Sequence, residues 1–438
     1  MVSLRSVWQK TTELPKFGPL EGDERTDVLI IGGGITGILC AYLLSQAGVD
    51  YRLLEAAELC GGVTGCTTAK LTSQHGLIYE KLRRQFGLEG ARMYLEANEA
   101  ALARYRALCR GIDCDYQEQD SHVYAMDRRD KLEKELATLN ALGFPAELVS
   151  EPSLPFPTAG ALRFPGQAQF HPLKFLAALT RGLRIHERTK VLELAPGEAR
   201  THQGRVRAEK IIIATHFPLL NKHGGYFLKL YQHRGYVLAL EGASIPPGMY
   251  VDEAEGGLSL RSYGNLLLLG GAGHRTGKKG AAWDELSAFA HRAYPEAREI
   301  GRWAAQDCMS LDGVPYIGQY SQRTPGLFTA SGFNKWGMTS AMVAAMLLTD
   351  LVQGREKPWA ELFSPSRSML RPQLAANLLE STLNLLTPTA PRCPHMGCAL
   401  KYNPQEHSWD CPCHGSRFET DGRLINNPAT DDMKGRPR

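Results

Sequence analysis

The sequence has no apolar run long enough to cross a membrane. A membrane helix needs roughly 18 consecutive apolar residues, and the first apolar run, 28–31, is short and leads into glycines. Charged residues precede this run, so it does not form the core of a signal peptide. We therefore expect no membrane insertion and a cytoplasmic location.

Strong charge of one sign is also absent. The net charge is only +4 over 438 residues, and the aromatic residues are scattered rather than interleaved with basic runs. Nucleic-acid binding requires clustered positive charge, so we expect no nucleic-acid partner. The hydrophobic content of 43% is that of a globular protein. A chain of this length is expected to form two or three domains.

Cysteines are sparse along most of the chain. Six of the ten are dispersed, and we expect them to be reduced structural thiols. The other four, Cys393, Cys398, Cys411 and Cys413, lie within 21 residues near the C-terminal end. In a cytosolic protein such a cluster indicates a metal site before it indicates a disulfide scaffold.

A glycine-rich segment predicts a dinucleotide-binding fold. The apolar strand 28–31 leads into Gly32, Gly34 and Gly37, which form G-x-G-x-x-G at the start of a helix. The three glycines would permit a tight turn, backbone approach to a pyrophosphate, and close helix packing, respectively. The positive end of the helix would face the phosphates. Glu55 ends the next strand, where a ribose-binding acid belongs, and it argues against a 2′-phosphate.

Two later segments resemble the closing signature of the D-amino-acid oxidase/sarcosine oxidase/glycine oxidase superfamily. They are 312–318, Asp-Gly-Val-Pro-Tyr-Ile-Gly, and 327–339, Leu-Phe-Thr-Ala-Ser-Gly-Phe-Asn-Lys-Trp-Gly-Met-Thr. Further pieces of the resemblance are 65–75, 169–172 and 211–215. The resemblance implies FAD as the cofactor, held by an α/β, Rossmann-like domain of the glutathione-reductase type with an interleaved α+β substrate domain. The cofactor-binding residues expected from the fingerprint and the resemblance are Gly32, Gly34, Thr36, Gly37, Glu55, Thr68, Lys70, Val191, Gly332, Gly337, Met338 and Thr339.

The cysteine cluster resembles a Rieske [2Fe–2S] signature. Segments 393–398, Cys-Pro-His-Met-Gly-Cys, and 411–416, Cys-Pro-Cys-His-Gly-Ser, together give C-x-H-x15-C-x2-H. In Rieske clusters two cysteines hold one iron and two histidines hold the other. The resemblance therefore implies metal ligands at four positions, which are Cys393, His395, Cys411 and His414. Zinc is the alternative for such a donor set, although Asn-Pro-Ala at 427–429 is similar to the Rieske proline loop.

Other positions of this module follow from the same resemblance. Cys398 and Cys413 match the pair that forms a disulfide between the two loops of high-potential Rieske proteins. Ser416 matches a hydroxyl that donates to a cluster sulfide and raises the potential. Phe418 stands where many relatives have a donating tyrosine, so we expect a somewhat lower potential.

The expected domain organisation follows from these motifs. The predicted parts are an N-terminal arm at 1–26, an FAD-binding domain at 27–80, 160–225 and 300–363, a substrate domain at 81–159 and 226–299, a linker and helix at 364–390, and a small all-β Rieske module at 391–438. The module is shorter than Rieske domains usually are. We therefore hypothesise that the flavin domain supplies the missing wall.

Candidate catalytic residues come from comparison with the superfamily patterns. Amino-acid oxidases carry a carboxylate-binding arginine in W-x-x-L-R-P, and Asp307 occupies that position here. A carboxylate there would attract a cationic amine, although a hydrogen-bonded loop aspartate is an equally open interpretation. Sarcosine oxidases place an oxygen-activating lysine in G-G-L-K-L, whereas Ser259 occupies that position here and favours a dehydrogenase. Other candidates for the site are Tyr231, His233, Lys335 and Trp336, and Cys308 is an alternative covalent anchor for the flavin.

A flavin accepts two electrons and a [2Fe–2S] cluster carries one, so a chain with both can split and relay electrons. The leading hypothesis is a dehydrogenase that oxidises a small amine and passes electrons through the Rieske cluster to an external one-electron carrier. One alternative is a ferredoxin-driven reductase of a C=N or C=C bond. The other is a non-catalytic redox or electron-carrier protein.

Overall fold

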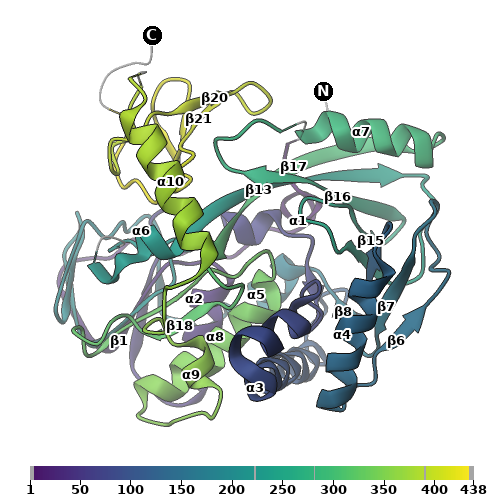
Figure 1. The fold of residues 1–438 in the computed structure, drawn as a ribbon. Helices are drawn as coiled ribbons and strands as arrows, with labels where there is room; N and C mark the ends of the chain where they lie inside the picture. The colour runs from purple at the N-terminus through teal and green to yellow at the C-terminus, as the bar shows by residue number, and fades with distance from the viewer. Residues whose placement is uncertain (1–3, 221–222, 281, 389–390, 434–438) are drawn as a thin grey trace.

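The chain forms two sheet-based parts followed by a small C-terminal β module in the computed structural model (Figure 1). The structure describes residues 4–220, 223–280, 282–388 and 391–433. Residues 1–3, 389–390 and 434–438, at the ends of the predicted arm, linker and module, lie outside the described residues.

The first sheet is built on buried parallel strands. β1 runs parallel to β2 on one side and to β12 on the other, so that Ile30 stands opposite Leu53 and Ile212. The apolar residues point to both faces, as expected for a parallel sheet that helices cover on both sides. The strands are β1 (Glu24–Ile31), β2 (Tyr51–Leu54), β9 (Ile185–His186), β10 (Glu193–Ala195), β11 (Glu198–Arg200), β12 (Arg205–Ile213), β18 (Tyr316–Gln319) and β19 (Leu327–Ser331).

The second sheet is mostly antiparallel, with a parallel pair between β14 and β5. Its order is β17-β13-β16-β15-β14-β5-β7-β6. The strands are β5 (Ser121–Ala125), β6 (Glu147–Val149), β7 (Gly160–Phe164), β13 (Leu230–Glu241), β14 (Met249–Asp252), β15 (Ser259–Tyr263), β16 (Leu266–Arg275) and β17 (Arg298–Ser310). A separate small sheet is formed by β3 (Lys70–Leu71), β8 (Ala168–Gln169) and β4 (Gln117–Glu118).

Helices pack against both sheets. α8 is buried along most of its length because it packs against α2 and α3, which explains its small apolar residues. Figure 1 shows α7 over the second sheet and α3 and α4 beside it. The helices are α1 (Val7–Thr11), α2 (Ile35–Gln46), η1 (Val63–Cys66), α3 (Ile78–Cys109), α4 (Arg129–Leu142), α5 (Pro172–Leu179), η2 (His223–Gly225), α6 (Tyr226–Lys229), α7 (Ala282–Ala293), α8 (Gly337–Val352), α9 (Ala360–Phe363) and α10 (Pro372–Leu386).

The C-terminal module is a four-stranded antiparallel sheet. Its strands are β20 (Lys401–Asn403), β21 (Ser408–Asp410), β22 (Arg417–Glu419) and β23 (Leu424–Asn426). α10 connects the module to the body, and the Ala399 amide donates to the Asn384 carbonyl near the end of this helix. In Figure 1 the module sits above β13 and behind α10.

Sheet membership differs from the predicted domain boundaries at two places. β7 and β17 belong to the second sheet, although the sequence assigns 160–225 and 300–363 to the FAD-binding domain. The reason is that β17 pairs with β13 along its whole length, from Ser310 to Arg298. Asp307 therefore lies on a strand of the second sheet. No helix of the described residues is long and apolar enough to span a membrane.

Candidate functional site

A cavity of about 1230 Å³ is lined by residues of both sheets and of the C-terminal module. Most of the predicted site residues line it, namely Gly32, Gly34, Thr36, Glu55, Thr68, Lys70, Val191, Tyr231, Asp307, Gly332, Lys335, Trp336, Gly337 and Met338. Gly37, Thr339 and His233 are not among its lining residues.

The glycines at one end of the cavity leave no room for side chains. Gly32 has a φ of +111°, and a Cβ there would lie 2.5 Å from the Ala214 carbonyl oxygen. A Cβ on Gly37 would lie 1.9 Å from the Gly32 carbonyl oxygen. The Glu55 carboxylate accepts a 2.6 Å hydrogen bond from the Gly33 amide. This backbone cradle at the start of α2 fits the pyrophosphate and ribose of a dinucleotide.

Substitution of Gly37 tests this cradle directly. Gly37→Ala is expected to lower flavin content at least tenfold, because the new methyl group would push α2 away from the turn at Gly32. Flavin absorbance per chain after gel filtration measures the effect. Gly18→Ala is the control, because a Cβ at Gly18 meets nothing within 4 Å. Full flavin content in Gly37→Ala would contradict the assignment.

The loop before α8 is strained and firmly held. Asn334 and Lys335 are consecutive non-glycine residues with left-handed φ values of +52° and +72°. The side-chain Nδ2 of Asn334 donates to the Gly332 carbonyl at 2.6 Å, and its side-chain Oδ1 accepts a hydrogen bond from the Ser310 backbone amide at 2.8 Å. Strain of this kind persists where the surroundings over-determine the backbone, which is typical of functional sites.

His75 is a cavity residue that the sequence analysis did not single out. Its ring stacks on Trp336 with a centroid distance of 4.8 Å, and Nδ1 lies 2.7 Å from the Tyr94 hydroxyl. Burial lowers the pKa of His75 to about 3, so the ring is neutral. Its Nε2 is buried and has no hydrogen-bond partner in the described part of the chain. An unpaired buried nitrogen on a cavity wall fits a bound polar group such as the flavin.

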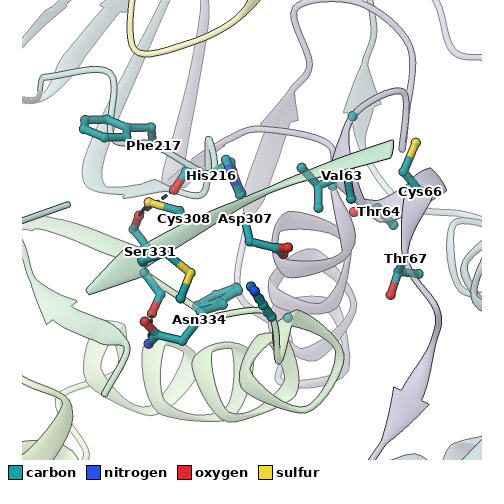
Figure 2. Close-up of a pocket in the computed structure, with 18 of the residues that line it drawn as sticks. Val63, Thr64, Cys66, Thr67, His216, Phe217, Asp307, Cys308, Ser331 and Asn334 are labelled. Carbon is teal, nitrogen blue, oxygen red and sulfur yellow. Dashed lines mark hydrogen bonds between the residues drawn. The ribbon is translucent and has the colours of Figure 1, made fainter. Parts of the chain in front are cut away.

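The substrate candidates lie on the facing strands β13 and β17. Asp307 stands opposite His233 in the register and lines the cavity beside His216 and Cys308 (Figure 2). Burial raises the pKa of Asp307, while Lys335 and Arg234 oppose the shift. Asp307 and Lys335 are therefore one acidic and one basic group among the charged residues that line the cavity.

His233 and Tyr231 are poorly suited to acid–base chemistry at neutral pH. Burial, followed by the charge of Lys335, lowers the pKa of His233 to about 3. Its Nδ1 lies 3.3 Å from the Glu255 carboxylate. Burial raises the pKa of Tyr231 to about 12, and Arg275 lies over its ring at 5.0 Å.

Cys308 is a protonated thiol. Burial raises its pKa to about 12, and its Sγ lies 3.5 Å from the Ser331 hydroxyl. Because the thiolate is the reactive form of cysteine, these surroundings do not favour the covalent flavin anchor that the sequence left open.

Two loops of the C-terminal module have the same hydrogen-bond pattern. In the first loop the Cys393 amide donates to the Cys398 carbonyl, and the Gly397 amide donates back to the Cys393 carbonyl. In the second loop the Cys411 amide donates to the Ser416 carbonyl, and the Gly415 amide donates back to the Cys411 carbonyl. The fifth residue of each loop is a glycine with left-handed φ, +78° in the first and +89° in the second. The repeated Cys-Pro and Gly positions of the sequence therefore produce two matched loops.

The predicted ligands lie together at the tips of these loops. The His395 and His414 rings are 4.9 Å apart and nearly perpendicular, and the neighbouring Cys411 thiol raises the pKa of the Cys393 thiol. Nδ1 of His414 is buried without a hydrogen-bond partner among the residues described. Two thiols and two imidazoles match the donor set of a Rieske cluster.

The predicted disulfide pair lies next to this site. Cys398, Cys411 and Cys413 have sulfur atoms within 4.8 Å of one another. All ten cysteines are free thiols in this structure, so the disulfide between Cys398 and Cys413 stays a prediction. The Ser416 hydroxyl accepts a 3.0 Å hydrogen bond from the Ala429 amide and links the second loop to the proline loop. Phe418 is fully buried.

A buried charge cluster fastens the module to the second sheet. The Glu406 carboxylate of the module forms ion pairs with Arg234 of β13 and Arg417 of β22, the latter at 2.9 Å. The Tyr236 hydroxyl donates to the same carboxylate at 3.1 Å. All three charged side chains are at most 10% exposed. The second sheet therefore supplies a wall for the shortened module, whereas the sequence hypothesis assigned that wall to the flavin domain.

Two glutamines join the cavity wall to the cluster loops. Gln232 Nε2 donates to the His414 carbonyl at 3.1 Å and to the Asn427 carbonyl at 3.0 Å. Gln306 Nε2 donates to the Gly415 carbonyl and to Gln232 Oε1, both at 2.8 Å. His216 lines the cavity, and the neighbouring Gln232 side chain opposes part of the effect of burial on the pKa of His216. Burial lowers the pKa of His216 to about 4.

Comparison with known protein families assigns the two parts of the chain to families. Residues 27–351 match the family described as FAD dependent oxidoreductase. The chain belongs to this family. Residues 383–437 match the Rieske [2Fe-2S] domain. The cofactors are therefore FAD and a Rieske [2Fe–2S] cluster, which favours iron–sulfur over the zinc alternative and accords with the donor sets of the two sites.

Relatives share one or both parts of this FAD dependent oxidoreductase. YhfW of Bacillus subtilis (strain 168), whose name calls it a Rieske 2Fe-2S iron-sulfur protein, is 34% identical over 98% of this chain and 97% of its own length. Gamma-glutamylputrescine oxidoreductase of Escherichia coli (strain K12) is 24% identical over 77% of this chain and 86% of its own. The structure of glycine oxidase from Geobacillus kaustophilus superposes with a TM-score of 0.67 and 21% identity, over 79% of this chain and all of the other.

Proposed function

We propose that this FAD-dependent oxidoreductase is an amine dehydrogenase that sends electrons from its cavity to the Rieske cluster. Oxidation of a CH–NH group to C=N releases two electrons and two protons. Bound FAD would supply the acceptor for the electron pair, and the [2Fe–2S] cluster would supply a one-electron relay to two equivalents of an external one-electron carrier. We place this reaction in the cytoplasm, with Cys393, His395, Cys411 and His414 as the cluster ligands.

One observation carries the proposal: the module that bears the cluster loops also closes the flavin cavity. Residues 424–430, which contain the proline loop, line the same cavity as Gly32 and Asp307. Gln232 of β13 donates from its side-chain amide to the His414 carbonyl and to the Asn427 carbonyl of the proline loop, which ties the second sheet to both loops. A short path from the flavin cavity to the cluster loops provides the reduced flavin with an electron acceptor other than oxygen.

The charge of the cavity supports an amine as the substrate. Asp307 stands where the amino-acid oxidases have their carboxylate-binding arginine, and it lines the cavity without a hydrogen-bonded basic partner among the described residues. The Asp307 carboxylate is partly exposed in the cavity, where a substrate ammonium would provide its positive partner. The names of two relatives, gamma-glutamylputrescine oxidoreductase and glycine oxidase, refer to amine-bearing compounds.

Substitution of Asp307 by its neutral isostere tests the substrate class. Asp307→Asn is expected to raise the KM for an active amine at least tenfold, because the charge-assisted contact is worth about 1.5–3 kcal/mol. Since the pKa of Asp307 is raised, amine binding by the wild type should weaken as the pH falls through that raised value, and Asp307→Asn should lose this dependence. Asp307→Glu is the charge-preserving control. An unchanged KM in Asp307→Asn would contradict this role.

Anaerobic mixing with a panel of primary and secondary amines tests the whole proposal. An active amine should bleach the flavin and then produce the EPR signal of the reduced cluster in the same sample. Bleaching by a ferredoxin-type donor alone would favour the reductase alternative, in which electrons run towards the cavity. A flavin that no donor of either type reduces would contradict both enzymatic functions.

A further inference from the structure

The cavity wall contains a buried amine that has no acidic partner. Lys70 of β3 is 7% exposed, and its Nζ donates to the Ser259 hydroxyl at 2.6 Å and to the Thr68 hydroxyl at 3.3 Å. No carboxylate in the described part of the chain forms an ion pair with it. The neighbouring Arg261 is also buried and donates to the carbonyl oxygens of Thr68 and Ala69. Buried positive charge without a counter-charge is costly unless a ligand supplies one.

The position of this amine is specific. Ser259 stands at the position where the G-G-L-K-L pattern has a lysine, and Lys70 reaches its hydroxyl from a different strand. β3 is held against β15 by β8, because Gln169 pairs with Lys70 and donates to the Ser262 hydroxyl at 2.9 Å. The motif around Ser259 contains no lysine, but in the folded chain the Lys70 ammonium lies beside the Ser259 hydroxyl.

The approach of Lys70 to β15 is built into the backbone. Ala69 has a left-handed φ of +56°, which is unfavourable for a residue with a Cβ. Its carbonyl oxygen accepts the Arg261 guanidinium at 2.8 Å. The strained turn at Ala69 and the buried arginine together direct Lys70 towards Ser259 and the cavity.

We propose that Lys70 is the relocated amine of this cavity, and that its ammonium, held on the Ser259 hydroxyl, supplies the positive charge that faces the bound flavin. The proposal depends on flavin binding and not on the amine substrate or on transfer to the cluster. Its consequence is that anions bound at the flavin, and negative charge that develops there, are stabilised only while Lys70 carries its proton.

The charge of Lys70 changes within the physiological pH range. Burial, assisted by the charge of Arg261, lowers the pKa of Lys70 to about 7. The other groups that face it are uncharged: the hydroxyls of Ser259 and Thr68, and Gln169 of β8. α8, which packs against β3, has no charged residue before Asp350. The ammonium is therefore present below about pH 7 and is lost above it.

Sulfite binding to the flavin of the holoenzyme reports this charge without turnover. Sulfite is an anion that bleaches an accessible oxidised flavin, so a spectral titration gives its affinity. At about pH 6, Lys70→Met should bind sulfite at least tenfold more weakly than the wild type, and at about pH 8.5 the two should agree within about threefold. Because sulfite itself titrates, its affinities for the variant and the wild type are compared as a ratio at each pH, in which that titration cancels. Lys70→Arg should remain tight at both pH values.

Two further variants distinguish a positive charge beside Ser259 from the effect of removing any lysine that lines the cavity. Lys81→Met removes another lysine that lines the cavity, from α3, and should leave sulfite affinity unchanged. Lys70→Met with Ser259→Lys returns an amine to β15 and should restore at least most of the lost affinity at about pH 6. If Lys70→Met is purified without flavin, Lys70→Gln carries the same test.

Three results would overturn the proposal. They are wild-type sulfite affinity in Lys70→Met at about pH 6, an equal loss in Lys81→Met, and a Lys70→Met, Ser259→Lys double variant as weak as Lys70→Met alone. None of these results depends on the identity of the substrate or on the cluster, so failure here is distinguishable from failure of the proposed dehydrogenase function.

Discussion

His414→Ala is expected to abolish the Rieske EPR signal and to leave the flavin in place. The buried Nδ1 of His414 has no protein partner among the residues described, and its ring faces His395 at the loop tips. Loss of one of two imidazole ligands should lower cluster occupancy at least tenfold, since even outer-sphere substitutions at metal sites cost 10–100-fold. Iron content, the EPR signal of the dithionite-reduced protein and flavin absorbance are the measurements.

His407→Asn is the matched control for this variant. His407 belongs to the same module but lies in the turn between β20 and β21, and asparagine tolerates its left-handed φ of +50°. The control should retain both cofactors. A full EPR signal in His414→Ala, or its loss in His407→Asn, would contradict the assignment of His414 as a ligand.

Glu406→Gln is expected to release the C-terminal module from the body. The carboxylate is buried between Arg234 and Arg417, and its removal leaves the Arg234 guanidinium without its counter-charge, whereas Arg417 keeps its ion pair with Asp410. Breaking a buried ion pair costs about 3–5 kcal/mol, which is large for an interface of this size. Release of the module should make the linker 364–390 easier to cleave in limited proteolysis. It should also slow the transfer of electrons from flavin to cluster.

The pH dependence of docking has a definite sign. Burial alone would raise the pKa of Glu406, but Arg234 and Arg417 outweigh it, so the pKa lies below its usual value. A carboxylate with a lowered pKa stabilises the docked state above its ordinary pKa, and this stabilisation is lost as the pH falls through the lowered value. Docking should therefore persist at neutral pH and weaken only in acid.

The control for Glu406→Gln is Glu419→Gln in the same module. The Glu419 side chain is 42% exposed and pairs with the more exposed Arg423 at 3.7 Å, so its loss should change linker proteolysis very little. Equal protease resistance of Glu406→Gln and the wild type would contradict the view that this charge cluster fastens the module.

Locally encoded features were predictable from the sequence. The fingerprint at Gly32, Gly34 and Gly37 needs only a strand, a turn and a helix, and all three appear where the spacing placed them. The matched cysteine–histidine loops followed from residue spacing in the same way.

Long-range contacts were not predictable. His75, His216 and Gln232 become site residues only because strands distant in sequence meet at the cavity. The domain boundary at 300 missed β17 because a strand of alternating burial can belong to either sheet. Alternation along β13 offered one signal for Gln232, since it points away from the neighbouring Tyr231 and His233.

The same limit affected the interpretation of Ser259. The absence of a lysine in its motif favoured slow reaction with oxygen, but the motif carries no information about Lys70, which lies 189 positions earlier and reaches the same hydroxyl. The electron exit through the module, rather than Ser259, is therefore the stronger argument for a dehydrogenase. The module contacts in turn depend on β13 and β17, which supply the wall that the short C-terminal sequence lacks.

Anaerobic photoreduction followed by EPR tests the central claim, electron transfer between the flavin cavity and the cluster, most directly. Illumination in the presence of EDTA delivers electrons to the flavin without any need for the substrate. The account predicts that flavin bleaching is accompanied by a rhombic Rieske signal that approaches one per chain. A flavin that becomes fully reduced while the cluster stays oxidised, although dithionite can reduce it, would contradict the claim.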